Sequence, residues 1–582
     1  MLELELFVIF VTSLALTFSL IPLIMRLAST YGLYDFPDSH SLVLGTPRRI
    51  HAKPIPRLGG IAMVVGFFSS MLIWASPLPL RPIFGGSVLM FCMGVVDDIK
   101  PLSAKLRLLL QCLVAGITVF MSNLGLETVA LSANLALDIP SWMGQVMAIF
   151  ILIGSINAIN LADGLDGLAG GVVLISIVLL SLLHFLASGD VGLLIFLTVP
   201  LTGCLLGFLR YNTHPASIFM GDGGSTWLGY LMGAYLLLVL NNAHLAAEGH
   251  VLQLRKLDTP IPFISVVMCL AVPITDTAVV IIRRLAAGKR IMSADRSHFH
   301  HTLLKIGLSH SESVLTIYFL ALVSGISGLM PIAYPSYKLE WVPYLSAVFI
   351  GLLIIFSLQI NEVLYSKIVK IRDLIFRERR SNRFVRLAVR YLYTFNRYLI
   401  YGILMVAPVL AGVPPKSLGY AAIAGIVMLF ASLFKMDLAN FFQSFVISLA
   451  ATILLTAINF NTLSVSFMNK TYEIHSFYNY GFFLLLIGTI FYFFLTAKAK
   501  SLLMTPTDFL MLGLPLLLLL VPEPFKTEFR LNIISLRALV LFVAIRVLSK
   551  NKSGTLRRIR LVCFSGLVYV SLAALYHLKI IY

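Results

Sequence analysis

Long apolar stretches follow one another along the chain, and short polar segments separate them. Each stretch runs for about 20 residues, which is the length that an α-helix needs to cross the hydrocarbon core of a bilayer. The stretches are continuously apolar and do not alternate as the strands of a membrane barrel do. The pattern therefore predicts an all-α polytopic membrane protein, with about 11 transmembrane helices in an N-terminal core and about seven more at the C-terminus.

The predicted spans of the core lie near residues 5–26, 59–76, 82–97, 106–123, 142–160, 170–187, 191–209, 224–241, 261–282, 313–333 and 341–359. Those of the C-terminal region lie near residues 399–412, 417–434, 439–458, 479–497, 506–521, 533–548 and 561–578. The first stretch lacks a basic leader and a small-residue cleavage pattern. It is therefore interpreted as a retained span and not as a signal peptide.

Basic side chains gather in alternate loops between the predicted spans. The loops that contain Arg57, Lys105, Arg210 and Arg290 are basic, whereas the loops between them carry few charges. Because basic loops stay in the cytoplasm, this arrangement places the basic set inside and the N-terminus outside. Orientation then accounts for the 44 Lys and Arg residues against 26 Asp and Glu residues, a formal charge of +18. A nucleic-acid partner is not expected.

A densely basic segment divides the apolar pattern into two parts. Residues 366–398 carry ten Lys and Arg residues, and each gains about 1 kcal/mol beside anionic lipid headgroups. The sequence thus predicts a membrane core over residues 1–365, a basic cytoplasmic linker over 366–398 and a C-terminal multispan region over 399–582. The last region has no comparable polar motif, and its role is open between structural support, partner binding and retention of a lipid product.

The composition narrows the class of protein. Hydrophobic residues make up 59% of the chain and charged residues 12%, which excludes a water-soluble globular enzyme. The five cysteines all fall in apolar stretches without paired spacing. Neither a disulfide framework nor a thiolate metal site is therefore predicted, and the rare charged groups become the natural place to look for chemistry.

Three short acidic motifs lie where predicted spans meet the cytoplasmic side. They are Asp97-Asp98 after the third span, the series Asn160, Asp163 and Asp166 after the fifth, and Asp222 at the start of the eighth. Carboxylates brought together repel one another unless a cation joins them, and hard oxygen ligands favour Mg²⁺ or Mn²⁺. The motifs therefore predict phosphoryl chemistry at the membrane surface. Taken singly, they also fit a solvated helix end or a calcium-binding turn.

Two further motifs are predicted on the same face. His298, His300 and His301 fall in the basic loop after the ninth span, where they can bind metal or donate hydrogen bonds to phosphate. Lys53 and Arg57 precede a glycine pair at the start of the second span, an arrangement that suits a nucleotide phosphate or an anionic headgroup. The alternative for the histidines is that they belong to a solvated basic loop without a function. The prediction of all these motifs on one side of the membrane favours a common functional site.

Taken together, these motifs resemble the polyprenyl-phosphate N-acetylhexosamine-1-phosphate transferase family, which includes undecaprenyl-phosphate GlcNAc-1-phosphate transferases and phospho-MurNAc-pentapeptide translocase. Segments 51–60, 97–98, 157–169, 212–225 and 298–301 carry the resemblance, which spans about residues 1–360. It implies that a UDP-N-acetylhexosamine donates its sugar 1-phosphate to a polyprenyl phosphate and that UMP is released. It also implies a bacterial inner-membrane protein whose active site faces the cytoplasm, with a homodimer left open.

The resemblance further implies roles for single residues. Asp222 matches the family's Mg²⁺ ligand, and Asn160, Asp163 and Asp166 match positions that line the metal and diphosphate. Asp97 matches an aspartate proposed to deprotonate the lipid phosphate, with Asp98 beside it, and the choice between them stays open. Asn212 and Phe219 match nucleotide-site residues, Phe219 by stacking on uracil. The three histidines match a motif near the donor's phosphates or sugar.

Two details bear on the substrate and on rival functions. The segment 295–301 resembles the non-peptidoglycan branch, so UDP-GlcNAc is the expected donor and a MurNAc-pentapeptide donor the alternative, although Thr302 stands where many relatives have Arg. A transporter or lipid flippase is the alternative from another class. Such a protein would place acidic groups near the bilayer midplane, where the pattern places Asp276.

Overall fold

The computed structural model describes residues 2–31, 34–35, 54–74, 80–132, 135–188, 194–241, 243–248, 251–256, 261–286, 288, 298–305, 308–357 and 383–407, and further along the chain residues 464–467, 470–473 and scattered single positions. The chain divides into two compact units, Met1–Tyr365 and Ser366–Tyr582. Lys53, which the sequence singles out, lies outside the described residues.

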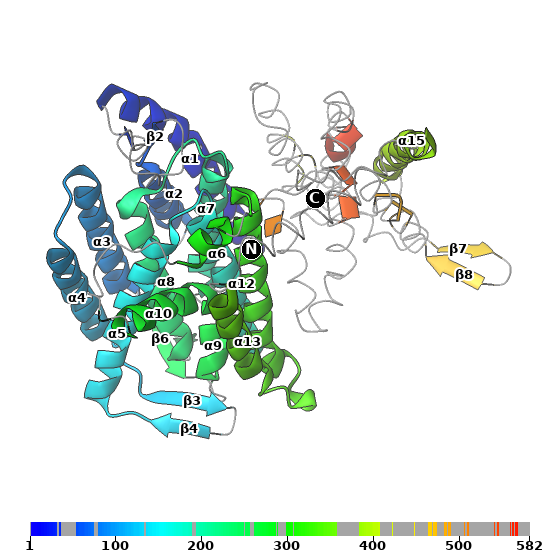
Figure 1. Cartoon of the computed structure of the whole chain (residues 1–582). Helices are drawn as coiled ribbons and strands as arrows, with labels where there is room; N and C mark the ends of the chain where they lie inside the picture. The colour runs from blue at the N-terminus through cyan, green and yellow to red at the C-terminus, as the bar shows by residue number, and fades with distance from the viewer. Residues whose placement is uncertain are drawn as a thin grey trace, which may run out of the picture. The chain divides into compact units, whose positions relative to one another are not determined.

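The first unit is a bundle of helices (Figure 1). In chain order they are α1 (Leu2–Tyr31), α2 (Gly59–Trp74), α3 (Arg81–Ile99), α4 (Ala104–Met121), α5 (Ser141–Ala162), α6 (Leu168–Ser188), α7 (Leu194–Asn212), α8 (Gly221–Leu240), α9 (Phe263–Met268), α10 (Ala271–Ala286), α11 (Phe299–Lys305), α12 (His310–Ala333) and α13 (Val342–Ser357). Every predicted span of the core coincides with a helix, and the ninth is broken into α9 and α10.

Seven helices of the described residues are long and apolar enough to cross a membrane. They are α1, α3, α4, α5, α6, α8 and α12. Two others, α2 and α13, are apolar but shorter. The prediction of a helical, multi-pass membrane protein is confirmed, whereas the count of about 11 spans in the core stays a prediction.

Helix α8 runs through the interior of this unit (Figure 1). Every residue from 223 to 240 is buried, and α8 packs against α3 on one side and α5 on another. Glycines permit this close packing, because a Cβ on Gly229 would lie 2.6 Å from the Cα of Ile156 in α5. Small residues at such contacts let helix backbones approach within a membrane bundle. The first turn of α8 carries Asp222, so this packing also fixes the position of that carboxylate.

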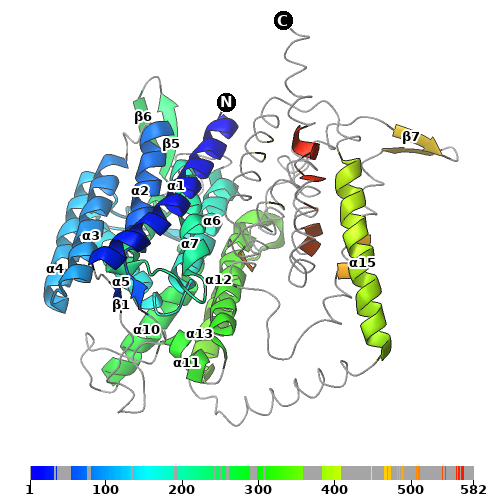
Figure 2. The ribbon, with the colours of Figure 1, turned by 90° about the horizontal axis from the view of Figure 1, so that it is seen from above.

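Short β-hairpins supplement the helices, a feature that the all-α prediction misses. Strands β3 (Thr128–Ser132) and β4 (Leu135–Asp138) pair at one end of the bundle (Figure 1), and β5 (Ala243–Glu248) pairs with β6 (Val251–Lys256) (Figure 2). Strands β1 (Tyr34–Asp35) and β2 (Ile55–Pro56) also pair. Hydropathy averaged over about 20 residues detects membrane spans. Strands of two to six residues are too short to affect that average, so hydropathy does not reveal them.

The described part of the second unit contains one long helix, α15 (Arg383–Val406), and the hairpin of β7 (Ser464–Phe467) and β8 (Lys470–Glu473). Helix α15 has a buried face with Ile400 and Leu404 and an exposed face with Tyr391 and Tyr398. It continues through residue 398, where the sequence predicts a boundary between linker and membrane region. The other predicted C-terminal spans fall almost entirely outside the described residues and stay predictions.

Candidate active site

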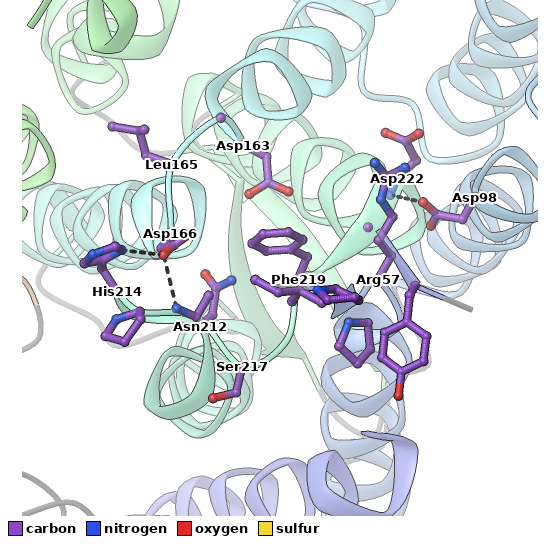
Figure 3. Close-up of a pocket in the computed structure, with 18 of the residues that line it drawn as sticks. Arg57, Asp98, Asp163, Leu165, Asp166, Asn212, His214, Ser217, Phe219 and Asp222 are labelled. Atoms are coloured by element: carbon purple, nitrogen blue, oxygen red, sulfur yellow. Dashed lines mark hydrogen bonds and ion pairs between the residues drawn. The ribbon is translucent and has the colours of Figure 1, made fainter. Parts of the chain in front are cut away.

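A cavity of about 1070 Å³ lies within the first unit, and segments far apart in the sequence form its wall (Figure 3). The residues that line it include Met25, Tyr34, Arg57, Asp98, Asn160, Asp163, Gly164, Asp166, Asn212, His214, Ser217, Phe219, Asp222, His301 and His310. The end of α3, the end of α5 and the start of α8 therefore meet at one place. The acidic motifs thus converge, as their positions where predicted spans meet one face of the membrane indicate.

The two neighbouring aspartates of α3 point in different directions. The Asp98 carboxylate lines the cavity and accepts hydrogen bonds from the backbone N–H groups of Asp222 and Gly223, both at 2.9 Å. These N–H groups belong to the first turn of α8, where a carboxylate acts as a helix cap. Asp98 thereby fixes the end of α3 against the start of α8.

Asp97 does not line the cavity. Its carboxylate accepts hydrogen bonds from the backbone N–H of Leu102 at 2.6 Å and from Nη1 of Arg107 at 2.9 Å. Successive residues of an α-helix differ by about 100° in direction, so only one of the two adjacent carboxylates can face the cavity. Asp98 therefore faces the cavity, and Asp97 holds the turn between α3 and α4. Which of the two acts on the lipid phosphate stays a prediction.

Asn160 joins the acidic groups of α5 and α8. Its Nδ2 donates to Oδ1 of Asp222 and to Oγ of Ser225, both at 2.8 Å. Helix α5 ends two residues later, and Asp163 lies at its C-cap. Burial raises the pKa of Asp163 from 3.8 to about 7, with further contributions from the negative charges of Asp222, Asp98 and Asp166. An acidic group that titrates near neutrality is typical of a functional site.

The same group of residues suits a hard divalent cation. Asp98, Asp163 and Asp222 supply carboxylate oxygens, and Asn160 supplies an amide. Burial is the main cause of the raised pKa of Asp163, and the negative charges of Asp222, Asp98 and Asp166 add to it, while Arg57 offsets only part of this. Mg²⁺ prefers oxygen ligands of this kind and usually keeps coordination positions for phosphate and water. The residues present therefore fit the Mg²⁺ that the sequence predicts.

Backbone hydrogen bonds hold Phe219 in the wall of the cavity. Its N–H donates to the carbonyl of Pro56 at 2.8 Å, and its carbonyl accepts from the N–H of Gly59 at 2.8 Å. The N–H of Gly60 similarly donates to the carbonyl of Met220 at 2.9 Å. The glycine pair thus uses its N–H groups to hold the loop before α8, whereas the sequence suggests that a helix start at this place binds an anion. Arg57, just before it, does line the cavity.

Gly221 is the first residue of α8 and follows this loop. Its φ angle is +74°, a conformation that glycine adopts readily and that other residues rarely adopt. A Cβ at this position would overlap the backbone carbonyl of Arg57 and lie 2.6 Å from Oδ2 of Asp98. Glycine is therefore required both by the backbone conformation and by the close approach of the Asp98 carboxylate.

Asp166 lies at the other end of the cavity, across Phe219 from Asp98 and Asp222 (Figure 3). Its Oδ2 lies 2.7 Å from Nδ1 of His214 and accepts a hydrogen bond from the N–H of Ala216 at 3.1 Å. Burial acts to raise the pKa of Asp166, but the hydrogen bond with His214, the nearby His310 and the Ala216 N–H together lower it. Asp166 is therefore an anion in a setting unlike that of Asp163.

Asn212 braces the loops beside Asp166. Its Oδ1 accepts from the N–H of Gly167 and its Nδ2 donates to the carbonyl of Ile218, both at 2.9 Å. The side chain is buried, although it borders the cavity. Both ends of its amide thus hold backbone, which fixes the loop after α5 to the loop before α8.

The histidine motif enters the site through α11. Asp276 of α10 accepts a hydrogen bond from the N–H of Phe299 at 2.7 Å, and its Oδ2 lies 3.0 Å from Nδ1 of His298. Asp276 thus orients the start of α11. Its position within a predicted span, which the sequence offered in favour of a transporter, is therefore explained by this structural contact. Burial, together with the neighbouring histidines, holds the pKa of His300 well below 6.5, so that its ring is neutral.

The three predicted histidines therefore occupy different places. His298 pairs with Asp276, and His300 is buried with its ring against Gly164. His301 lines the cavity, and neither His298 nor His300 does. A Cβ on Gly164 would overlap the His300 ring, which explains a glycine directly after Asp163.

Sequence reasoning missed His214 and His310, which both line the cavity. His214 lies within a segment whose neighbours Asn212 and Phe219 were singled out, and this proximity was the available signal. His310 is the first residue of α12, directly after Ser309, which forms a capping box with Glu312. That Ser-x-x-Glu pattern marks a helix start in the sequence, but it does not reveal which cavity the helix start faces.

Comparison with known proteins agrees with this geometry. Residues 80–240, which include Asp98, Asp163 and Asp222, match the family described as Glycosyl transferase family 4. The chain is 33% identical over 327 residues to a Bacillus subtilis protein named probable undecaprenyl-phosphate N-acetylglucosaminyl 1-phosphate transferase. The aligned region covers 56% of this chain and 84% of that relative. The chain belongs to glycosyl transferase family 4.

Two other relatives show a similar extent of similarity. A decaprenyl-phosphate N-acetylglucosaminephosphotransferase of Mycolicibacterium smegmatis is 32% identical over 335 residues, which covers 54% of this chain and 79% of the relative. A phospho-N-acetylmuramoyl-pentapeptide-transferase of Desulfotalea psychrophila is 30% identical over 329 residues, covering 51% and 82%. The family predicted from the motifs is thereby confirmed, and the protein is a membrane-embedded transferase of the cell-wall biosynthesis class.

Proposed function

We propose that this protein transfers N-acetylhexosamine 1-phosphate, in the first instance GlcNAc 1-phosphate, from a UDP-sugar to a polyprenyl phosphate and releases UMP. One observation carries the proposal: Asp98, Asp163 and Asp222 meet at one end of a cavity whose wall also contains Phe219 and Arg57. This arrangement offers a cation site for phosphates beside an aromatic ring for a base. The named activities of the B. subtilis and M. smegmatis relatives support it.

The reaction requires one P–O bond to form and one to break. An oxygen of the polyprenyl phosphate attacks the β-phosphorus of the UDP-sugar, and the oxygen that bridges the two phosphates leaves with UMP. Both reactants are anions, so catalysis depends on positioning and on offsetting negative charge. Mg²⁺, held by Asp222 with Asp98, Asp163 and Asn160 around it, would neutralise charge on the diphosphate.

The protein's own residues divide the remaining tasks. Asp98 holds the first turn of α8 through two backbone N–H groups and so positions Asp222. Asp163 lines the same end of the cavity, and once Mg²⁺ holds it in the ionised form it can accept a proton from the lipid phosphate. Arg57 adds positive charge at the same end of the cavity, and Phe219 is placed to stack on the uracil.

We infer that the site faces the cytoplasm of a bacterial inner membrane. Counting the apolar helices along the sequence puts the acidic motifs on the same side of the membrane as the basic loops. Basic loops stay in the cytoplasm. The bacterial origin of the relatives supports this orientation. Polyprenyl phosphate would then reach the site from the bilayer and the sugar nucleotide from the aqueous side.

Product analysis tests the proposed function. Purified protein in detergent is incubated with Mg²⁺, undecaprenyl phosphate and UDP-GlcNAc labelled in the sugar, and nucleotide and lipid products are separated. UMP with label in the organic phase is the expected result, whereas UDP would identify an ordinary glycosyltransferase and overturn the proposal. Parallel reactions with UDP-GalNAc and UDP-MurNAc-pentapeptide identify the donor, and a faster reaction with the pentapeptide would overturn the choice of GlcNAc.

Asparagine variants of the two neighbouring aspartates are expected to show opposite effects. Asp98→Asn should lower kcat by at least about 100-fold, because it weakens the cap that positions Asp222. Asp97→Asn should leave kcat within about tenfold, but it should cost about 1 kcal/mol of stability as the bond from Arg107 weakens. Steady-state assays and thermal unfolding measure the two effects. A larger loss of kcat in Asp97→Asn would contradict the assignment.

Alanine at Gly221 is expected to lower activity by at least about 100-fold, because the added Cβ would displace Arg57 or the Asp98 carboxylate. Gly288→Ala is the matched control, since Gly288 also has a positive φ, +64°, but no heavy atom among the described residues lies within 4 Å of its Cβ position. Both variants carry the same backbone strain of about 1–2 kcal/mol. Equal activity of the two variants would show that the crowding at Gly221 is unimportant.

A further inference from the structure

Three possible metal ligands lie together at the end of the cavity away from Asp98 and Asp222. Asp166 comes from the loop after α5, His214 from the loop before α8, and His310 from the first position of α12. One ligand atom from each of these residues lies within 4.8 Å of the other two. Figure 3 places Asp166 and His214 across Phe219 from the acidic end of the cavity. The group is therefore distinct from the carboxylates that suit Mg²⁺.

The distances suit a shared ion. Oδ2 of Asp166 lies 2.7 Å from Nδ1 of His214 and 3.9 Å from Nε2 of His310. Ligand atoms about 2.1 Å from a tetrahedral zinc ion are about 3.4 Å from one another. The Asp166–His214 pair must therefore separate by about 0.7 Å and the Asp166–His310 pair must approach by about 0.5 Å, which small side-chain rotations achieve.

His310 supplies an independent observation. Its side chain is 10% exposed, and neither ring nitrogen has a hydrogen-bond partner among the described residues. The 3.9 Å from Nε2 to Asp166 is too long for a hydrogen bond. The ring stacks on that of His214 with centroids 4.2 Å apart and planes inclined by 17°, and the Asp166 carboxylate lies near it, so both neighbours hold the ring in the group. Buried polar atoms normally have a partner. A metal ion can be that partner, because a neutral imidazole nitrogen binds it directly through its lone pair.

The ligand set identifies the class of ion. Mg²⁺ and Ca²⁺ prefer oxygen ligands only, whereas two imidazoles and one carboxylate are typical of zinc and similar divalent ions. Three protein ligands leave one coordination position, as in zinc sites that are open to the solvent. His214 is 42% exposed at the cavity, so an ion can reach the group from the aqueous side.

We propose that Asp166, His214 and His310 bind a zinc-class divalent ion and that the bound ion inhibits the transferase. The inhibition rests on the proposed function. A divalent charge at this end of the cavity competes with the end formed by Asp98 and Asp222 for the donor's diphosphate. Donor bound in that way has its β-phosphorus far from the acidic group and does not react.

Binding of Co²⁺ tests the metal site without any substrate. Co²⁺ replaces zinc in sites of this kind and absorbs visible light strongly when four ligands surround it. Protein without a polyhistidine tag, in excess Mg²⁺, is titrated with Co²⁺, and the expected result is one ion per chain with the spectrum of a tetrahedral site. His214→Gln and His310→Gln should each weaken binding at least tenfold. Glutamine nearly preserves the size and polarity of the side chain, and thermal unfolding verifies that each variant is folded.

Two matched variants locate the site. His301→Ala removes a histidine that lines the same cavity but lies outside the group, and it should leave Co²⁺ binding unchanged. Asp222→Ala removes the principal carboxylate of the acidic end and should also leave it unchanged. Loss of Co²⁺ binding in Asp222→Ala, retention in both glutamine variants, or absence of binding to the unaltered protein would each overturn the metal site.

Inhibition is tested separately, so that failure of the proposed function and failure of the metal site give different results. UMP release is measured against zinc concentration, with each variant compared with its own rate without zinc. The concentration for half inhibition should rise at least tenfold in His214→Gln. An unchanged value would overturn the inhibitory role while leaving Co²⁺ binding as established. Release of UDP in place of UMP would overturn the proposed function alone.

Discussion

Alanine at Asp222 is expected to abolish UMP release, to below about 0.1% of the unaltered rate, which corresponds to about 4 kcal/mol of transition-state stabilisation. Asp222 is the first-turn carboxylate of α8, and the side chain of Asn160 holds it at 2.8 Å. Its removal would take away the principal proposed Mg²⁺ ligand at the place where the diphosphate must lie. Radiochemical detection of UMP at saturating donor and lipid concentrations measures the loss.

The control for this variant is Asp138→Ala, the same chemical change at an exposed residue of strand β4. It should retain full activity. Asp222→Asn adds a second comparison, because it keeps an oxygen that can accept from Asn160 and removes only the charge. Substantial activity in either Asp222 variant would show that Asp222 does not hold the metal, and it would overturn the proposed arrangement of the site.

The second large effect is a proton released when Mg²⁺ binds. The pKa of Asp163 is raised from 3.8 to about 7 by burial and by the negative charges of Asp222, Asp98 and Asp166. Without metal the group is therefore protonated below about pH 7 and ionised above it. A cation favours the ionised form, so its binding expels the proton. The affinity for Mg²⁺ should consequently rise about tenfold between pH 6 and pH 8 and change little above that range.

Calorimetric titration with Mg²⁺, without substrates, measures this effect in two buffers of different ionisation enthalpy. The unaltered protein should release about half a proton per ion from Asp163 at pH 7. Asp163→Asn should remove that release and flatten the pH dependence of Mg²⁺ affinity, besides lowering kcat. Asp138→Ala again serves as the control. The same proton release in Asp163→Asn would show that Asp163 does not titrate with metal binding.

The sequence predicted those features of the site that depend on a single helix or a single loop. The convergence of Asp98, Asp163 and Asp222 follows from the lengths of the spans and from the placement of basic loops on one side of the membrane. Each of these residues lies at the start or the end of an apolar stretch on that side. The family follows from the order of the same motifs. Hydropathy could not detect the hairpins β3–β4 and β5–β6, since their strands are much shorter than a membrane span.

The choice between Asp97 and Asp98 could not be made from the sequence. Both are acidic and adjacent, and only the rotation of α3 against α8 decides which carboxylate faces the cavity. The roles of the histidines were undecidable for a similar reason. His298 pairs with Asp276 from another helix, so its partner depends on how α10 and α11 pack.

The sequence by itself therefore determined that this is a helical membrane transferase and that its carboxylates gather at one end of its spans. The helical spans and the position of the carboxylates are contained in apolar length and in the sign of each loop, which are properties of single segments, and the transferase assignment is contained in the motifs that resemble the family. Tertiary structure alone brought Asp166, His214 and His310 together, because three segments contribute one residue each. Such a group forms no short motif with a recognisable spacing in the sequence. Packing between the loops and α12 places its members at one end of the cavity.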